Sequence, residues 1–212
     1  MRDACPKSCN FCQDLIPAIY APSDTPTTYR SDIPSETPTD KPSQIPISWQ
    51  PMGGDINGEA AGDYSGESVS LSSDGNVVAI GAPRNFENGY YSGHVRVYTW
   101  DSSNFIWLQM GDDIDGEAPA YDYSGGSVSL SSNGNVVAIG AAGNDGNGTS
   151  SGHTRVYKWD SSDLTWHQMG GDINGEVAAL SSDGDTVAIG ATGNNGNGYD
   201  SGHVRVYSVR AA

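Results

Sequence analysis

Residues 63–83 read D-Y-S-G-E-S-V-S-L-S-S-D-G-N-V-V-A-I-G-A-P, and residues 122–142 repeat them as D-Y-S-G-G-S-V-S-L-S-S-N-G-N-V-V-A-I-G-A-A. A third copy, at residues 179–192, keeps A-L-S-S-D-G-D-T-V-A-I-G-A-T and lacks the D-Y-S-G start. Each copy continues through a loop into S-G-H-[VT]-R-V-Y. Trp49, Trp107 and Trp166 lie 58 and then 59 residues apart and mark the repeating unit. Self-similarity at such a period indicates a repeat architecture.

Each unit contains four candidate strands. In the first unit they run from Glu67 to Ser73, Val77 to Ala82, His94 to Trp100 and Phe105 to Asp112. The first alternates apolar residues with serines and is followed by a D-G or N-G hairpin signal. The second is apolar on both faces, which requires neighbours on both sides of the sheet. This pattern predicts an all-β, β-propeller-like fold with about three four-stranded antiparallel blades.

The ends of the repeat region predict how the blades are completed. The region begins with a fourth strand, around Trp49, and ends after a third strand, His203 to Val209, so the first segment is expected to complete the last blade. Three blades fall short of the 4 to 8 found in ordinary propellers. We therefore expect a fragment of a larger propeller. An open ring and two chains that pair their open ends are the alternatives, and we expect self-association through open edges.

Two segments without repeats precede the predicted propeller-like domain at 47–212. Residues 1–14 hold Cys5, Cys9 and Cys12, an odd cluster that indicates part of a disulfide framework, with a zinc-binding or free-thiol segment as the alternative. Residues 15–46 are rich in Pro, Ser and Thr and hold little apolar surface to bury. They predict a disordered linker, either O-glycosylated or unmodified.

Composition limits the partners and the compartment. The net charge of -16 excludes a nucleic-acid backbone as the natural partner, because such binding needs clustered Lys and Arg. The sequence contains neither an apolar run long enough for a membrane span nor an amino-terminal signal segment. The cysteine cluster nevertheless favours a secreted or cell-surface protein. A signal peptide is therefore expected upstream of Met1.

The run Y-S-G-x-S-V-S-L-S-S-[DN]-G-N-V-V-A-I-G-A-[PA] resembles the FG-GAP repeat, the blade unit of integrin α-subunit propellers. Tyr64-Ser65-Gly66 stands at the Phe-Gly end, and Gly81-Ala82-Pro83 matches the Gly-Ala-Pro end. Tandem copies of this kind also resemble repeat-rich surface or secreted proteins of diatoms and related algae. The spacing C-x3-C-x2-C resembles the carboxy-terminal end of a ShK-toxin-like (ShKT) domain, and the resemblance implies that all three cysteines form disulfides.

The FG-GAP resemblance implies extracellular adhesion or ligand binding through the loops of the propeller. We accordingly expect a non-enzymatic binding module for protein or glycan ligands, since no convergent catalytic set is found. One alternative is an enzyme that acts on polysaccharides and whose catalytic residues lie outside this fragment. The other is a cytosolic propeller scaffold. An upstream signal peptide would exclude the scaffold.

Calcium is the cation that the family resemblance implies. Several family blades bind it in a D-x-D-x-D-G loop, which has shrunk here to S-S-D-G-N and leaves too few oxygens for the 6 to 8 that calcium takes. The Gly/Asn-rich loops before S-G-H hold more oxygen ligands, although tight turns select the same residues. The candidate calcium ligands are Asn144, Asp145, Asn147, Asn195, Asn197 and Asp200.

Other residues of these loops suggest further sites. Tyr90, Tyr91 and Tyr199 are candidates for stacking on sugars or peptides, with turn packing as the alternative. Asn147-Gly148-Thr149 is an N-glycosylation sequon. The histidines of S-G-H lie one blade apart and cannot share one metal ion, so we expect them to pack as scaffold residues. Asp112 and Asp113 are expected to face solvent.

Overall fold

The computed structural model describes residues 47–117, 121–146 and 148–210. The three cysteines, the whole of the 15–46 linker and Asn147 of the sequon and of the calcium set lie outside the described residues. Regular structure in the described part is entirely β. Within these residues no helix is long and apolar enough to cross a membrane.

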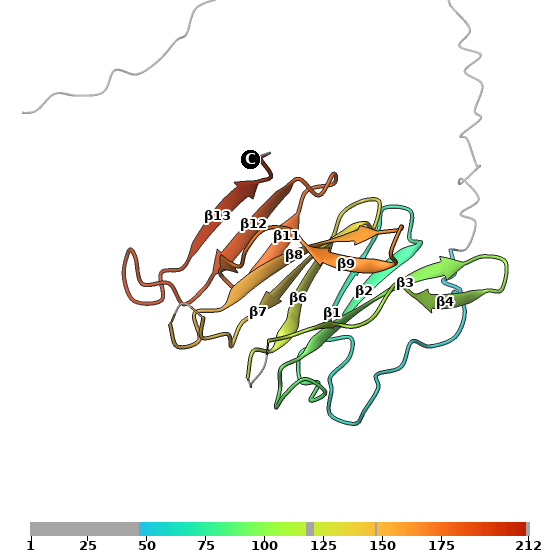
Figure 1. The fold of residues 1–212 in the computed structure, drawn as a ribbon, viewed down its shortest axis with the longest axis horizontal. Coiled ribbons are helices and arrows are strands. Elements are labelled where there is room, and N and C mark those ends of the chain that lie inside the picture. The colour runs from blue at the N-terminus through green and yellow to red at the C-terminus, as the bar shows by residue number, and fades with distance from the viewer. Residues whose placement is uncertain (1–46, 118–120, 147, 211–212) are drawn as a thin grey trace, which may run out of the picture. The chain divides into compact units, whose positions relative to one another are not determined.

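The strands fall into three antiparallel sheets that follow one another along the chain (Figure 1). In the first two sheets the order is β1-β2-β3-β4 and β6-β7-β8-β9, with the short β5 and β10 pairing β3 and β8, and the third sheet is β11-β12-β13. The strand bounds are β1 Ser68–Leu71, β2 Val77–Ala82, β3 His94–Asp101, β4 Ile106–Gln109, β5 Ile114–Asp115, β6 Ser124–Leu130, β7 Val136–Ala141, β8 His153–Asp160, β9 Thr165–Gln168, β10 Ile173–Asn174, β11 Val177–Leu180, β12 Thr186–Ala191 and β13 His203–Ser208. The predicted propeller-like architecture is confirmed.

The second strand of each unit forms the centre of its sheet. Every residue of β2 and β7 is buried, as the apolar V-V-A-I-G-A sequence predicts. The D-G and N-G hairpins before these strands place Gly75, Gly134 and Gly184 at positive φ, a conformation that glycine adopts without steric cost. The sequence therefore specifies both the turn and the buried strand that follows it.

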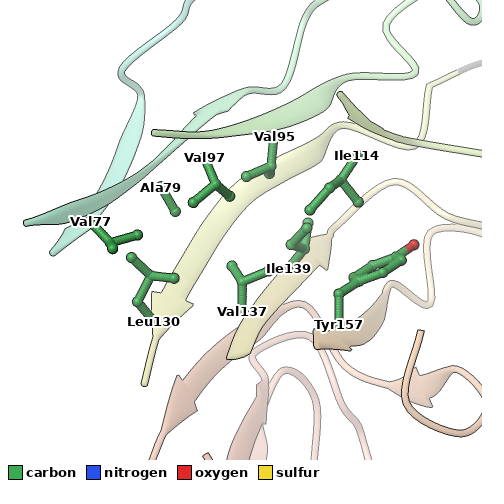
Figure 2. Close-up of a cluster of buried hydrophobic side chains, with 9 residues drawn as sticks. All are labelled: Val77, Ala79, Val95, Val97, Ile114, Leu130, Val137, Ile139 and Tyr157. Atoms are coloured by element: carbon green, nitrogen blue, oxygen red, sulfur yellow. The ribbon is translucent and has the colours of Figure 1, made fainter. Parts of the chain in front are cut away.

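Neighbouring sheets stack face to face on apolar side chains. Figure 2 shows the first interface, where Val77, Ala79 and Val97 of the first sheet meet Val137 and Ile139 of the second. A second cluster joins the second and third sheets in the same way, through residues such as Val136, Ala138, Val187 and Ile189. Burial of apolar area at about 25 cal/mol per Å² makes these interfaces a major source of stability.

Serine side chains of the inner strands link adjacent sheets by hydrogen bonds. Leu130 N donates to Ser70 Oγ at 2.9 Å, and the next interface repeats the bond between Leu180 N and Ser129 Oγ at 2.9 Å. Ser68 Oγ also donates to the backbone oxygen of Gly125 at 2.6 Å. The alternating serines of S-V-S-L thus face the next sheet, while the apolar residues between them face the opposite way.

The outer faces of the first and third sheets are exposed only in part, because Val78 and Ile80 at the centre of the first one are buried. Val69 and Leu71 of β1 are 63% and 60% exposed, although their equivalents Val128 and Leu130 lie against the first sheet. At the other end Val204 of β13 is 69% exposed. At the two interfaces between neighbouring sheets, the equivalent faces are covered.

The predicted strand around Trp49 is wrong. Residues 47–67 contain no strand, Trp49 is 95% exposed, and β13 pairs with β12 alone among the described strands. A fourth strand forms elsewhere by pairing with the third strand of its own sheet, as β4 does with β3. The described residues contain no third strand before Trp49 for such a pairing. Met52 is held in place, because Trp107 Nε1 donates to its backbone oxygen at 2.9 Å, as Trp166 Nε1 does to Met110 O.

Replacing Gly140 by alanine is predicted to destabilise the protein. A Cβ atom there would lie 2.0 Å from the Glu176 backbone oxygen of the adjacent sheet. Overpacking of this kind costs about 1–3 kcal/mol. The matched control is Gly190→Ala at the same repeat position, where the nearest atom is Val177 Cβ at 3.6 Å. Urea unfolding should show a clear loss of unfolding free energy for Gly140→Ala and little change for Gly190→Ala. Equal losses would contradict the tight approach of the sheets.

Candidate functional site

One end of the sheets carries the long loops, and we call it the loop face. It comprises residues 83–93, 142–146, 148–152 and 192–202 between the second and third strands, and residues 110–117, 121–124 and 169–176 between the sheets. The antiparallel order brings these segments to the same end. The short hairpins between the first and second strands lie at the opposite end. The loop face therefore holds most of the sequence that the repeated fold leaves free.

Six aromatic residues gather on the loop face at the junction of the first two sheets, and we call them the aromatic cluster. Its centre is Tyr91, whose ring centroid lies 4.3 Å from that of Tyr90 and 4.9 Å from that of Phe86. The guanidinium of Arg84 lies over the ring of Tyr64 at 4.2 Å. The full set is Tyr64, Phe86, Tyr90, Tyr91, Tyr121 and Tyr123.

The backbone fixes this cluster across two units of the repeat. Tyr121 N donates to Tyr90 O at 2.8 Å, and Tyr123 N donates to Tyr91 O at 3.0 Å. Tyr90 and Tyr121 are nevertheless 50% and 53% exposed. The rings are thus held in place while part of their surface stays open to solvent. Of the predicted ligand-facing residues, Tyr90 and Tyr91 come together here, while Tyr199 lies exposed in the third loop.

The repeat itself shows that the fold does not require these aromatics. The loop position of Tyr91 is occupied by Ser150 and Asp200 in the later copies, and all three have a positive φ of 47° to 55°. Gly62 occupies the position equivalent to Tyr121. Serine, aspartate or glycine therefore supports the same backbone. The backbone of the repeat therefore does not account for the aromatic side chains of Tyr91 and Tyr121.

Three of the predicted calcium ligands, Asn144, Asp145 and Asn195, use a side-chain oxygen within their own loops. Asn144 Oδ1 accepts from Gly146 N at 2.8 Å, and Asp145 Oδ1 accepts from Ser150 N at 2.6 Å. In the third loop Asn195 Oδ1 accepts from Asp200 N at 2.7 Å, and Asn197 N donates to Ser201 Oγ at 3.3 Å. These bonds close the turns. Calcium binding by these residues stays a prediction.

A buried aspartate–asparagine pair anchors each of the first two loops. Asn85 Nδ2 donates to Asp63 Oδ2 at 3.2 Å, and Asn144 Nδ2 donates to Asp122 Oδ1 at 3.3 Å. Burial raises the pKa of Asp122, although the Asn144 hydrogen bond acts in the opposite direction. The Asp of the D-Y-S-G segment thus anchors the loop of its own unit. The residues that follow this segment contact the adjacent sheet.

Beneath the loop face, His94 is surrounded by carboxylates. His94 is 1% exposed, and its Nδ1 lies 3.3 Å from Asp113 Oδ2 and 3.8 Å from Glu59 Oε2. Arg96 NH1 lies 3.4 Å from the other oxygen of Glu59. Glu87 completes a group whose ligand atoms all lie within 4.8 Å of one another. The histidine is buried as expected, but beside carboxylates rather than as a plain packing residue.

The second unit repeats this arrangement around His153. Its Nδ1 lies 3.8 Å from Asp172 Oδ2 and 4.0 Å from Glu117 Oε2. Burial, followed by the positive charge of Arg155, lowers the pKa of His153 and favours the neutral imidazole. In the third unit His203 and Glu176 line one cavity, but the described residues provide no following aspartate.

Sequence reasoning missed the carboxylates of these groups. The expectation that Asp113 faces solvent is wrong, because its side chain is only 18% exposed and turned toward His94. The missed signal is the repeated D-I-[ND]-G-E segment, at residues 55–59, 113–117 and 172–176. Its Asp contacts the histidine of the preceding unit, and its Glu contacts the histidine of the following unit. The repeat period conceals these pairings, because the partners belong to different copies.

A third acidic group, on the turn between β8 and β9, lacks the geometry of a catalytic triad. Thr165 Oγ1 and Asp163 Oδ2 lie 2.9 Å and 2.8 Å from the same ring nitrogen, Nε2 of His167. A nucleophile–base–acid relay needs its two partners on opposite nitrogens of the imidazole. This exposed group therefore does not form a nucleophile activated by a histidine.

Comparisons with known proteins find distant structural similarity alone. No family model and no curated protein matches the chain. Hydrazine synthase from Kuenenia stuttgartiensis is 13% identical, with a TM-score of 0.41, over 73% of this chain and 36% of that one. The periplasmic gluconolactonase of Pseudomonas aeruginosa is 13% identical, with a TM-score of 0.41, over 66% and 38%. A putative 6-phosphogluconolactonase from Bacteroides uniformis is 9% identical, with a TM-score of 0.34, over 69% and 54%. The chain covers less than two thirds of each, and similarity at this level carries no argument about activity.

The Asp74 turn gives a pH prediction. Hydrogen bonds from Ser72 and Asn76 lower the pKa of Asp74 to about 2. Because the folded-state pKa is depressed, this contribution to stability is present above the unfolded pKa and is lost as pH falls through about 2. Asn133 accepts equivalent bonds in the second unit, so Asp74→Asn is a matched uncharged variant.

The stability difference between the wild type and Asp74→Asn should therefore shrink between pH 5 and pH 2. Urea-unfolding midpoints of both proteins at several pH values in this range measure it, because other titrating groups cancel in the difference. A difference independent of pH would contradict the role of the Asp74 carboxylate.

Proposed function

We propose that the propeller-like domain is a non-enzymatic binding module that takes a protein or glycan ligand on its loop face. The aromatic cluster at the junction of the first two sheets carries the proposal. Its rings come from two repeat units, are held by backbone hydrogen bonds and keep about half of the Tyr90 and Tyr121 surface exposed. The positions equivalent to Tyr91 and Tyr121 lack aromatics elsewhere in the repeat. Recognition therefore explains them better than folding does.

The chemistry of the aromatic cluster suits neutral or cationic ligands. Tyrosine combines a large apolar ring with a polar hydroxyl and has only two side-chain torsions to order, which favours its use in binding surfaces. The net charge of -16 disfavours polyanions such as nucleic acids. Sugar rings or basic and aromatic peptide segments can stack on the open ring faces. We place the ligand at residues 84–91 and 121–123.

The sequence resemblance supports an extracellular setting for this module. FG-GAP-like repeats, the cysteine cluster and the Pro/Ser/Thr-rich linker together favour a secreted or cell-surface protein. In this proposal the linker separates the binding domain from the ShKT-like segment. Neither the aspartate pairs nor the exposed His167 group in the described residues offers a catalytic alternative of comparable support.

Replacing Tyr90 or Tyr121 by alanine is predicted to abolish or strongly weaken ligand binding. Loss of one central aromatic contact typically costs 2 kcal/mol or more, which corresponds to about a 30-fold loss of affinity. Binding of the full chain to a glycan array and to cell-surface protein fractions provides the ligand. Affinity of each variant for the ligand so identified then measures the effect.

The matched control is Tyr199→Ala, which removes the tyrosine equivalent to Tyr90 from the third loop. Tyr199 is exposed and has no ring contact within the described residues. Its replacement should leave binding unchanged. Binding that survives Tyr90→Ala and Tyr121→Ala in folded protein would contradict the proposed surface. A complete absence of binding to glycans and proteins would contradict the proposed function.

A further inference from the structure

We propose that the two repeated groups around His94 and His153 are binding sites for a divalent transition-metal ion such as Zn²⁺. The first site comprises His94, Glu59 and Asp113. The second comprises His153, Glu117 and Asp172. This inference goes beyond the proposed ligand-binding function and does not depend on it.

The unpartnered imidazole of His94 is the first argument. Its Nδ1 is buried and has no hydrogen-bond partner among the described residues, although two carboxylate oxygens face it at 3.3 Å and 3.8 Å. Zinc–nitrogen and zinc–oxygen bonds of about 2.0–2.2 Å in a tetrahedral site place ligand atoms roughly 3.4 Å apart. The observed spacing fits ligands around one ion. It is too long for good hydrogen bonds between them.

Neighbouring side chains orient both carboxylates toward the imidazole. Gln109 Nε2 donates to Asp113 Oδ1 at 2.6 Å, which leaves Oδ2 facing His94. Arg96 NH1 lies near Glu59 Oε1 at 3.4 Å, which leaves Oε2 facing the same ring nitrogen. Such outer contacts hold the ligands of metal sites in position. The arrangement leaves one oxygen of each carboxylate directed at a common point.

The second unit reproduces the same orientation with different residues. Gln168 Nε2 donates to Asp172 Oδ1 at 2.9 Å, and Arg155 NH1 lies 3.9 Å from Glu117 Oε1. His153 is 4% exposed, and its Nδ1 lies 3.8 Å and 4.0 Å from the remaining oxygens. Asn144 Nδ2 also donates to Glu117 Oε2 at 3.0 Å, a contact that the first site does not share. Two independent copies thus present the same donor set.

The donor atoms select the class of ion. One neutral imidazole with two carboxylates suits Zn²⁺ and similar transition metals, whereas calcium prefers 6 to 8 oxygens. The first site has a further carboxylate, from Glu87, where the second unit has Gly146. We therefore expect the first site to bind more tightly than the second. A water molecule can complete the coordination of the second ion.

The test is a zinc titration of the full-length chain. The protein is first stripped with a chelator, and its three cysteines are alkylated so that thiolates do not contribute. Isothermal titration calorimetry should then find two Zn²⁺ ions per chain, and zinc should raise the unfolding temperature. His94→Ala and His153→Ala should each remove one ion. Gln variants of the same histidines, similar in size, distinguish ligand loss from misfolding, with circular dichroism as the check.

His203→Ala is the internal control. The third unit has Glu176 and His203, but its described residues lack the second carboxylate, so this variant should leave the stoichiometry at two. The competing account treats both groups as ion pairs with a protonated histidine. No saturable zinc binding below about 1 mM, or a stoichiometry unchanged in folded His94 and His153 variants, would establish that account and overturn the proposal.

Independently, we infer that a second copy of this chain covers the exposed faces of the first and third sheets. Val204 and Val206 of β13 occupy the positions of Val95 and Val97, which pack on the second sheet. Val204 and Val206 are instead 69% and 67% exposed. In the first sheet this face forms an interface with the second sheet. The equivalent face of the third sheet is thus uncovered.

The first sheet carries the residues that would pack against this face of the third sheet. Val69 and Leu71 occupy the positions of Val128 and Leu130, which receive that interface in the second sheet, and they too are exposed. Val177 and Ala179 replace the serines of β1 at the open end of the third sheet, which makes that face more apolar. Two chains in head-to-tail contact would continue the established stacking. They would give six sheets, within the range of closed propellers.

Multi-angle light scattering of the full chain tests this inference. A dimer is expected at micromolar concentration, and Val206→Lys or Leu71→Lys should dissociate it. Tyr199→Lys adds the same charge on an exposed loop and should leave the dimer intact. A stable monomer at 100 µM, a value set well above about 1 µM affinity, would overturn the inference. A dimer insensitive to both lysine variants would also overturn it.

Discussion

The close stacking of adjacent sheets is the constraint on which the rest of this structure depends. At Gly140 the backbone of the next sheet comes so near that a Cβ atom would overlap the Glu176 oxygen. Serine hydroxyls of the inner strands accept hydrogen bonds from backbone amides of the adjacent sheet. Small residues and short polar side chains thus allow two apolar faces to meet while the amides of Leu130 and Leu180 keep hydrogen-bond partners. Of the two sequences, V-V-A-I-G-A keeps five of its six residues in the third copy, whereas the serines of S-V-S-L are replaced there.

The loop sequences can vary because the strands alone satisfy that constraint. Because the inner and central strands fix the stacking, loops of the same length can differ in sequence: before S-G-H they carry Tyr90-Tyr91 in the first unit, Thr149-Ser150 in the second and Tyr199-Asp200 in the third. The two proposed sites occupy different depths. The aromatic cluster lies at the surface, while His94 lies beneath the loops with its carboxylates. A bound ion would cross-link segments that precede and follow one sheet, and so would stiffen the support of the loops.

The sequence predicted those elements whose signal lies within one unit. Val77–Ala82 is buried on both faces as its composition requires, and the Asp74-Gly75 turn forms where the hairpin rule places it. Contacts between units were harder to predict from the sequence. Asp113 and Glu59 flank the repeat that contains His94, so no local spacing shows that they meet. The strand expected at Trp49 failed for a related reason, because strand formation depends on a partner that the local sequence does not reveal.

Hydrogen exchange of the inter-sheet amides tests the stacking most directly. Leu130 N and Leu180 N are bonded to serine hydroxyls of the preceding sheet rather than to a strand partner's carbonyl. If stacking is the constraint on which the fold depends, both amides should exchange only with the cooperative opening that also exposes β2 and β7. They should then share the opening free energy of those central strands. Exchange of Leu130 and Leu180 as fast as that of the exposed strand β13, with β2 and β7 still protected, would show that each sheet is stable alone and would contradict the account.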